Sequence, residues 1–190
     1  MQFKNLVLTP LVAAGIASAA PNPDVKVFQA VALRSASPIH HTNLQASMNG
    51  FALKLKDQGA SCDRGAKENA ATFTLNTKTK EMLLYSTSNP RQQAFTDRSG
   101  MGQGMLGYRT GAQPLCTRCE QDKWSINENN FLQYDDRDNF IACPQEDGSY
   151  SVFTSAGVDN PAGNKDCVSV TFAVSEVSEP VGCLYSQQGQ

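Results

Sequence analysis

The chain has 190 residues, of which 40% are hydrophobic and 18% are charged, and its 16 basic and 18 acidic residues give a net charge of −2. A slightly acidic balance argues against nucleic acid and anionic membranes as partners. The length suits one domain with a real hydrophobic core.

The first residues have the order of an export signal. Lys4 supplies a positive start, Leu6 to Ile16 an apolar stretch, and Ala17-Ser18-Ala19 a small-residue cleavage site. About eleven apolar residues are too few to cross a bilayer of about 30 Å. No later stretch is long and apolar enough, and the C-terminus lacks the hydrophobic tail of a lipid-anchor signal. We therefore expect a signal peptide over residues 1–19, a secreted protein and no membrane partner.

Short alternating runs separated by turn residues recur after the signal, and helical periodicity is hard to find. This pattern predicts one all-β domain over residues 20–190 with about a dozen short strands. The predicted strands are Val25–Arg34, Ile39–Ala46, Phe51–Lys56, Ala71–Thr77, Met82–Thr87, Gln93–Asp97, Met105–Thr110, Trp124–Asn127, Phe131–Asp135, Phe140–Cys143, Tyr150–Ser155 and Val168–Val177.

Two segments share one pattern. Phe73-Thr-Leu75 leads through a polar turn to Leu83-Leu-Tyr85, and Trp124-Ser-Ile126 leads in the same way to Leu132-Gln-Tyr134. Such self-similarity indicates a repeated hairpin unit, with a third, weaker copy near Phe28 to Phe51. A dozen strands with partial three-fold repetition favour a β-trefoil-like closed barrel, which removes exposed edges. A two-sheet β-sandwich explains the alternation without the repeat and is the alternative.

The stretch DRSGMGQGMLGY, Asp97 to Tyr108, is rich in glycine. A phosphate cradle would need a preceding strand, a following helix and, in a P-loop, a Lys-Ser/Thr pair. No helical pattern follows and the pair is absent, whereas Met105 to Gly111 has the pattern of a strand. We therefore predict a connection between two strands, and we expect no cofactor.

Candidates for catalysis are few. His40 and His41 are the only histidines, and as neighbours on a strand they would point to opposite faces and could not jointly hold a metal. Asp135 and Asp136 could act as the carboxylate pair of a glycoside hydrolase, but carboxylates in a turn are more often simply solvated. A serine triad would have to recruit one of the histidines, and Ser99 lacks the Gly-x-Ser-x-Gly setting. We expect no enzyme, no catalytic residue and no metal.

The cysteines are Cys62, Cys116, Cys119, Cys143, Cys167 and Cys183. An even number in an exported chain indicates disulfides rather than thiols or metal ligands, although sequence alone does not choose the connectivity. Cys116-Thr-Arg-Cys119 has the spacing of half a zinc site or of a redox pair. A second such pair is absent, as is the βαβ pattern of redox proteins, so a small surface disulfide is favoured.

A series of segments follows along nearly the whole mature chain: LRSASPIH, ASCDR, DRSGMGQGMLGYRTGAQP, WSI, FIACP, AGVDNPAGNKDC and VGCLY. Together they resemble the secreted phialide cell-wall proteins (PhiA-like) of filamentous fungi. The resemblance implies a wall-associated protein of asexual sporulation, which contributes to phialide and conidium formation and to stress protection without enzymatic activity. In this comparison Cys116 and Cys119 look like an extra pair.

With the extra pair joined locally, the resemblance leaves Cys62, Cys143, Cys167 and Cys183 as the common framework. Cys167 and Cys183 bracket a strand and could close a loop of about 16 residues, which would stabilise the fold by on the order of 3 kcal/mol. Cys62 then pairs with Cys143.

The wall partner stays open between a cell-wall polysaccharide and a wall protein, and the oligomeric state is unknown. A structural or protective wall protein is the leading hypothesis. The alternatives are a carbohydrate-binding module, or a secreted protein active against competitors or hosts. Carbohydrate contacts cannot be named from the sequence, since Trp124 lies in an alternating strand and is expected in the core.

Overall fold

Antiparallel strands make up nearly all the regular structure of residues 22–188, the part of the chain that the computed structural model describes. The predicted signal peptide lies outside these residues. Two 3-10 turns, η1 (Asp63–Gly65) and η2 (Pro161–Gly163), accompany the strands. The strands are β1 (Val25–Leu33), β2 (Gln45–Ser47), β3 (Gly50–Leu53), β4 (Ser61–Cys62), β5 (Thr72–Asn76), β6 (Met82–Leu84), β7 (Gln92–Asp97), β8 (Met105–Thr110), β9 (Trp124–Ile126), β10 (Leu132–Tyr134), β11 (Phe140–Pro144), β12 (Tyr150–Thr154), β13 (Val168–Glu176) and β14 (Cys183–Leu184).

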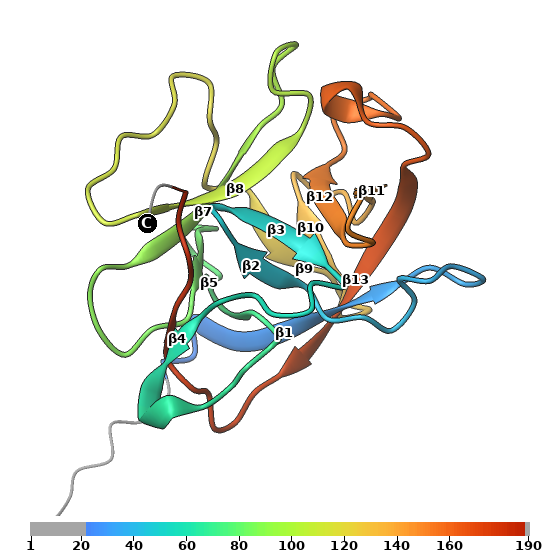
Figure 1. Ribbon diagram of the computed structural model, residues 1–190. Coiled ribbons are helices and arrows are strands. Elements are labelled where there is room, and N and C mark those ends of the chain that lie inside the picture. The colour runs from blue at the N-terminus through green and yellow to red at the C-terminus, as the bar shows by residue number, and fades with distance from the viewer. Residues whose placement is uncertain (1–21, 189–190) are drawn as a thin grey trace, which may run out of the picture.

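Nine strands close into an antiparallel barrel (Figure 1). Neighbours follow in the order β1, β5, β6, β7, β8, β3, β12, β11 and β13, which returns to β1. Strand β12 completes the ring because it pairs with β11 on one side and with β3 and β8 on the other. Closure removes the unpaired edges of the sheet, the feature for which the barrel is favoured over the sandwich. The predicted all-β fold and closed barrel are confirmed.

Three short strands and one hairpin lie outside this ring. Strand β2 extends the sheet beside β3, while β9 pairs with β10 and β4 pairs with β14 in separate two-stranded sheets. Strands β4 and β14 are missing from the predicted strands, since two residues carry no alternation. None of the helical turns in residues 22–188 has the length and hydropathy of a bilayer-crossing helix.

The two segments with a shared pattern both form hairpins. In the first, Phe73 lies opposite Leu84, and in the second, Tyr134 lies opposite Trp124. Strands β5 and β6 nevertheless stand in the barrel wall, whereas β9 and β10 form a sheet of their own. The repeat therefore describes a local hairpin, and the two copies do not occupy equivalent places in the barrel.

Aromatic side chains fill the interior. Phe28 of β1 stacks on Phe73 of β5 with ring centroids 5.5 Å apart, and Phe51 of β3 meets Tyr108 of β8 edge to face at 5.6 Å. All four are buried, as is Trp124, which confirms its predicted place in the core. Burial of one such side chain stabilises a fold by about 1.5–3 kcal/mol, so these rings dominate the packing.

The C-terminal segment after β14 is held against the barrel by buried polar contacts. The N–H of Thr72 donates to the hydroxyl of Tyr185 (3.0 Å). The side chain of Gln92 bonds both the N–H (2.8 Å) and the carbonyl (2.9 Å) of Tyr185. The hydroxyl of Tyr108 donates to the carbonyl of Ser186. A buried polar group that loses its hydrogen-bond partner destabilises the fold, so these contacts favour the C-terminal segment staying in place.

Two disulfides differ from the expected pairing. Cys62 is bonded to Cys183, and Cys143 is bonded to Cys167, so the predicted pairs Cys62–Cys143 and Cys167–Cys183 are wrong. Strand register explains both: β4 and β14 place Cys62 opposite Cys183, and the pairing of β11 with β13 brings Cys143 beside Cys167. The Cys62–Cys183 bridge spans 121 residues of sequence. A loop of this length corresponds to about 5 kcal/mol in the chain-entropy model.

Residues 98–104, here called the glycine connection, join β7 to β8, which confirms the predicted link between two strands. The hydroxyls of Thr96 and Thr154 lie 2.5 Å apart and are both buried beneath the connection. The N–H of Thr154 donates to the carbonyl of Gly104 (2.9 Å). The connection is therefore fixed to β12 at its C-terminal end.

The glycines of this connection meet different constraints. Gly104 has a φ of 89°, and a Cβ there would overlap the carbonyl oxygen of Thr154. A Cβ on Gly102 would overlap Asp97, whereas a Cβ on Gly100 would meet open space. Positive φ and close backbone approach are the two situations that only glycine tolerates well.

We predict that Gly104→Ala and Gly102→Ala each lower the free energy of unfolding by about 2 kcal/mol, or Tm by roughly 5 °C, because a neighbour must shift. Gly100→Ala is the matched control and should leave Tm within about 1 °C of the native value. Differential scanning calorimetry of the mature protein measures all three. Equal effects at the three positions would show that backbone crowding is not the cause.

Candidate functional site

The two histidines lie in a turn and not on a strand, so the prediction that they point to opposite faces is wrong. Their rings stack with centroids 3.8 Å apart. The turn forms because the N–H and the hydroxyl of Thr42 both donate to the carbonyl of Ile39, and His41 adopts a φ of 63°. His40 accepts the backbone N–H of Arg34 at Nδ1 (3.1 Å). Neither ring joins a group of three potential metal ligands within residues 22–188.

One group of three potential ligands is found in the described part of the chain: Asp97, Cys116 and Cys119. The two cysteines are joined to each other, which confirms the expected local bridge. A disulfide sulfur is not a thiolate and does not serve as a zinc ligand. The group is therefore a surface disulfide with a carboxylate beside it.

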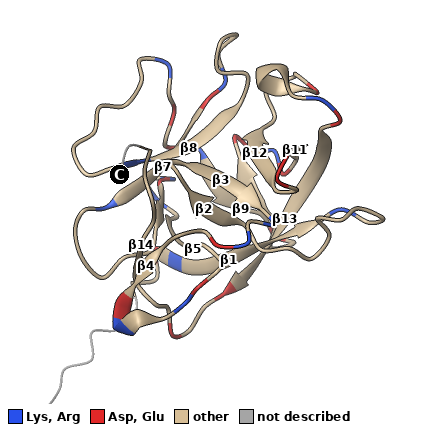
Figure 2. Ribbon diagram, in the orientation of Figure 1, with Lys and Arg blue, Asp and Glu red and all other residues tan. Residues whose placement is uncertain are grey.

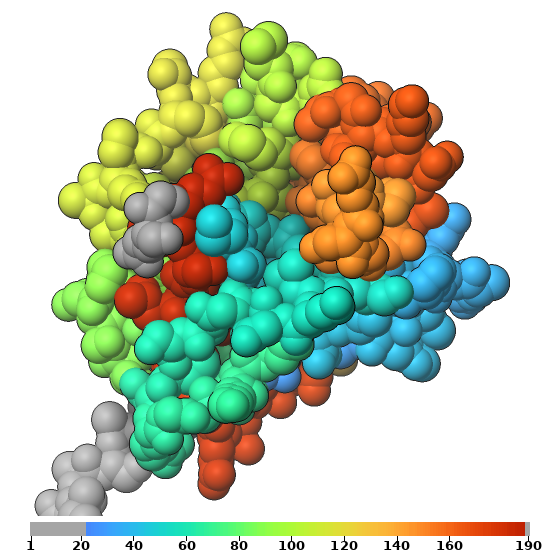
Figure 3. Space-filling model, in the orientation of Figure 1, coloured from blue at the N-terminus to red at the C-terminus, as the bar shows by residue number. Residues whose placement is uncertain are grey.

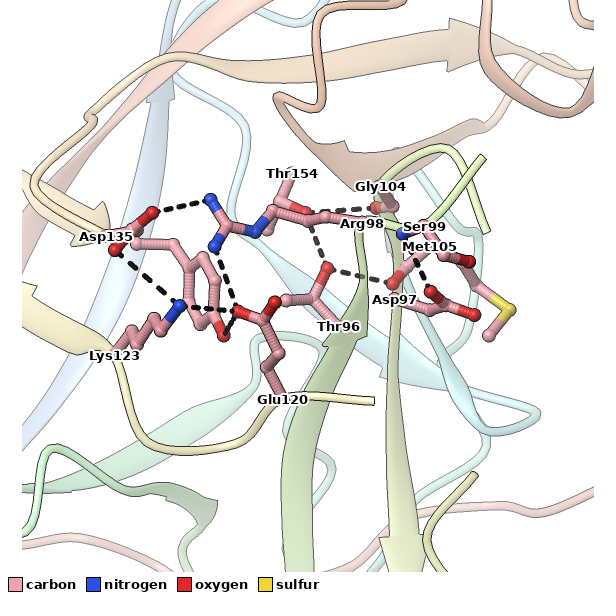
Figure 4. Close-up of polar contacts among 11 residues, drawn as sticks. Thr96, Asp97, Arg98, Ser99, Gly104, Met105, Glu120, Lys123, Asp135 and Thr154 are labelled. Carbon is pink, nitrogen blue, oxygen red and sulfur yellow. Dashed lines mark hydrogen bonds and ion pairs between the residues drawn. The ribbon is translucent and has the colours of Figure 1, made fainter. Parts of the chain in front are cut away.

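Five polar side chains form the Arg98 cluster: Arg98, Glu120, Lys123 and Asp135, which are labelled in Figure 4, and Tyr134. The guanidinium of Arg98 contacts Glu120 (2.9 Å) and Asp135 (2.7 Å), and Lys123 contacts Glu120 (3.0 Å). The hydroxyl of Tyr134 donates to Glu120 (3.1 Å), and the guanidinium lies 5.1 Å from the centre of the Tyr134 ring. These contacts tie the start of the glycine connection to the segment before β9 and to the end of β10.

The electrostatics of the Arg98 cluster favour fully charged side chains. Burial raises the pKa of the Glu120 carboxyl, but hydrogen bonds from Lys123 and Arg98 outweigh it and hold that pKa below its usual value. The hydrogen bond from Arg98 likewise holds the pKa of Asp135 low. Burial and the charge of Glu120 raise the pKa of the Tyr134 hydroxyl. The carboxylates are therefore ionised at neutral pH, and each is matched by a cation.

The two carboxylates considered as an acid–base pair, Asp135 and Asp136, both line one small hollow beside Lys80 and Lys123, but the electrostatics there do not suit catalysis. The Asp135 carboxylate is occupied by Arg98, and Asp135 and Asp136 occupy consecutive turn positions with φ of 53° and 58°. A glycosidase needs one carboxylic acid whose pKa is raised. The charge on Asp135 is instead stabilised, so this turn has the electrostatics of a structural ion pair.

The glycine connection also lacks the features of a phosphate cradle. The backbone N–H groups of Gly102, Gln103, Gly104 and Met105 all donate to acceptors within residues 97–102. The Asp97 carboxylate accepts a further N–H at the start of the connection (2.9 Å). Amides that are already bonded, with a carboxylate among them, do not attract an anion.

A shallow groove on the outer face of β5 and β6 has a different chemistry. Its volume is about 320 Å³, and it is lined by Val25, Thr74, Asn76, Glu81, Leu83, Leu84, Tyr85, Ser86 and Arg91. The Glu81 carboxylate is oriented by hydrogen bonds from Thr79 (3.0 Å) and Gln93 (3.0 Å). One aromatic ring among amide, carboxylate and guanidinium groups offers both an apolar face and hydrogen-bonding partners. We call this surface the Tyr85 groove.

The predicted strand alternation does not reveal either surface. Arg98 meets Glu120 and Asp135 across 22 and 37 residues of sequence, and only Asp135 is among the residues singled out from the sequence. The adjacent pair Asp135 and Asp136 is thus the signal in the sequence that points to the Arg98 cluster. For the Tyr85 groove, the Leu-x-Tyr pattern marks the strand but does not show that Tyr85 lines a groove. Basic and acidic residues are interspersed along the described chain (Figure 2), so no charge block marks either place.

We predict that Arg98→Gln lowers the free energy of unfolding at pH 7 by about 1–2 kcal/mol, between the values for exposed and buried pairs. A carboxyl group whose pKa is lower in the folded protein than in the unfolded chain stabilises the fold at any pH above the unfolded-state pKa. This contribution is lost as the pH falls through the pKa of the folded state. The difference from the native protein should therefore shrink between pH 5 and about pH 3, as urea denaturation can measure. Arg34→Gln, at an exposed arginine outside the cluster, is the control. A difference that stays constant over this range would rule out the ion pairs as its source.

Comparisons with known proteins agree on one family. Residues 28–186 match the family profile described as "PhiA-like secreted protein". The chain is 42% identical over 189 residues to "Cell wall protein phiA" of Aspergillus fumigatus, with 98% of this chain and 100% of the relative covered. It is 40% identical over 172 residues to the protein of that name from Emericella nidulans, covering 90% and 91% of the two chains. The Arthroderma benhamiae protein is 32% identical over 195 residues, with 98% and 100% covered.

No solved structure gives a significant match to the chain. The sequence matches extend over the barrel strands and all six cysteines, and they confirm the resemblance drawn from the sequence segments. The chain belongs to the family of PhiA-like secreted proteins, which are proteins of the fungal cell wall.

Proposed function

We propose that the protein is a non-catalytic structural component of the wall, which takes part in forming phialides and conidia and protects them under stress. The similarity to wall proteins named phiA over nearly the whole chain carries this proposal. The Arg98 cluster supports the non-catalytic part, because both of its carboxylates are held in their charged form by paired cations.

The covalent framework suits a protein that must last outside the cell. Three disulfides join the described chain, and two of them connect segments distant in sequence. Disulfides persist in oxidising extracellular surroundings and restrict the unfolded chain. A closed barrel also leaves few strand edges to pair with other chains or to open to proteases.

Binding of a wall polysaccharide is a second candidate function, and the Tyr85 groove favours it. A tyrosine ring can lie against the apolar face of a sugar while neighbouring polar side chains bond its hydroxyls. Glu81, Asn76 and Arg91 supply acceptors and donors around Tyr85 in this groove. A wall protein with such a groove would be retained by the polymer itself.

A deletion strain tests the wall role. We expect fewer or misshapen conidium-bearing structures while hyphal growth rate stays normal, and reintroduction of the native gene should restore the spores. Hot detergent or reductant should extract the protein from isolated walls, because its surface offers non-covalent contacts and an exposed disulfide. Normal sporulation in the deletion strain would refute the developmental role, and release only after glucanase or chitinase digestion would refute this mode of attachment.

Sugar binding is tested with insoluble chitin and β-glucan. If the Tyr85 groove binds either polymer, soluble oligosaccharide should block retention, and Tyr85→Ala should weaken it about tenfold, as loss of an aromatic contact allows. Met101→Ala, which truncates a 95% exposed side chain outside the groove, is the control. Retention that Tyr85→Ala leaves unchanged would exclude this groove as the binding surface.

A further inference from the structure

The three disulfides differ in how accessible they are. In the two bridges that connect distant segments, Cys183 and Cys143 are buried, with exposed fractions of 2% and 0%. In the third bridge, Cys116 is exposed and Cys119 is half-buried. A thiol reduces or exchanges a disulfide by attacking one of its sulfurs directly, so access governs the rate. Cys62 and Cys167, like Cys119, are half-buried, and Cys116 is the one exposed cysteine of the described chain, so the Cys116–Cys119 bridge is the most accessible of the three.

Opening this bridge would leave the rest of the fold in place. Its cysteines are three residues apart, whereas the other bridges span 121 and 24 residues, so it restricts the unfolded chain least. The surrounding segment is fixed at both ends. Gly111 donates to the carbonyl of Arg91 (2.8 Å), and Glu120 exchanges two backbone hydrogen bonds with Thr96 (both 2.8 Å).

The chain between these fixed points is loosely held. Within residues 114–119, the described backbone forms one hydrogen bond, from the N–H of Cys119 to the carbonyl of Cys116 (3.1 Å). Figures 1 and 3 show this segment projecting from the body of the molecule near the glycine connection. A segment with few backbone bonds can adjust to a partner without cost to the barrel.

A hollow of about 470 Å³ lies in front of the bridge, between it and the glycine connection. Cys116, Arg118 and Met101 line it, and Met101 is 95% exposed at its rim. This space admits a peptide segment, and the Arg118 guanidinium and the Asp97 carboxylate in its lining give it one charge of each sign. The Asp97 carboxylate lies within 4.8 Å of both sulfurs, where it can accept a hydrogen bond from a newly formed thiol.

We propose that the Cys116–Cys119 disulfide is a thiol–disulfide exchange site at which an external cysteine thiol becomes bonded to Cys116. The incoming thiolate attacks Sγ of Cys116, and the bond between Cys116 and Cys119 breaks. Sγ of Cys119 leaves with the electron pair and takes up the proton that the incoming thiol has lost. One disulfide and one thiol are present before and after the step, so no separate oxidant is required.

Small thiols and cysteines of wall proteins share this chemistry. The exchange itself is independent of the proposed role in sporulation, whereas its use as a reductant-sensitive link to the wall rests on that role. Attack at Cys116 follows from its exposure. Return attack by Cys119 limits the lifetime of the mixed disulfide, so the link is reversible.

The first test treats the mature native protein with reduced glutathione, stops the reaction with N-ethylmaleimide and maps the peptides. We expect Cys116 and Cys119 to be modified at least tenfold faster than the other four cysteines. The single variants lack the disulfide and are treated with oxidised glutathione, which exchanges with a cysteine thiolate and releases one molecule of reduced glutathione. Cys119→Ser should then keep glutathione on Cys116, and Cys116→Ser, the matched variant, should form its adduct on Cys119 at least tenfold more slowly. Circular dichroism checks that both variants are folded. Simultaneous loss of all three bridges, or equal reactivity of the two variants, would overturn the proposal.

The second test distinguishes wall proteins from small thiols as partners. A strain that produces the Cys116→Ser/Cys119→Ser double variant should lose the wall fraction released by reductant and keep the fraction released by detergent. Unchanged reductant release would refute the wall link while leaving the glutathione result valid. Sporulation of the deletion strain tests the proposed function independently of either exchange experiment.

Discussion

The bond between Cys62 and Cys183 joins β4 to β14 across 121 residues and holds the C-terminal segment that follows β14 against the barrel. Next to it, Tyr185 is 1% exposed and shares hydrogen bonds with Thr72 and Gln92. These buried donors and acceptors would lose their partners if the segment left, at a cost of about 1–3 kcal/mol for each unsatisfied group. The disulfide and the polar contacts therefore support each other, and these buried polar groups of the barrel are satisfied only with the C-terminal segment in place.

A closed barrel of this kind separates stability from surface chemistry. The strands supply the side chains of the buried core. The connections between strands carry the Arg98 cluster and the exposed disulfide. The Arg98 cluster anchors the glycine connection and the segment before β9 to the end of β10. Between these anchors, residues 114–119 present the exposed disulfide. The segment that carries the disulfide therefore forms few backbone hydrogen bonds of its own, but the residues on either side of it are firmly held.

Local pattern predicts much of this fold. The alternation in β1 and β13, the hairpin around Phe73 and the burial of Trp124 all follow from residues near one another in sequence. Alternation fails where a turn also buries apolar residues: Ile39 and Leu44 are both in the core, yet the chain between them bends at His41. Hydrophobic periodicity depends on which residues are buried and not on the direction of the backbone. A strand and a turn that bury the same residues therefore have the same sequence pattern.

Features that depend on strand register could not be predicted. The pairing of Cys143 with Cys167 follows from β11 lying beside β13. The spacing of the cysteines along the chain does not show which strands are neighbours. The same holds for Arg98, whose partners come from separate connections. Sequence similarity identifies the family and hence the wall location, but it does not locate the exchange site, which requires exposure and surroundings in three dimensions.

Native-state hydrogen exchange of the mature protein tests most directly whether the C-terminal segment is part of the barrel while residues 114–119 are loose. We expect the amides of Cys183 and Tyr185, which donate to Tyr85 and Gln92, to exchange as slowly as those of the barrel strands. The amides of residues 115–118 should exchange orders of magnitude faster. Exchange at Cys183 and Tyr185 as fast as at residues 115–118 would show that the C-terminal segment is not an integral part of the folded barrel.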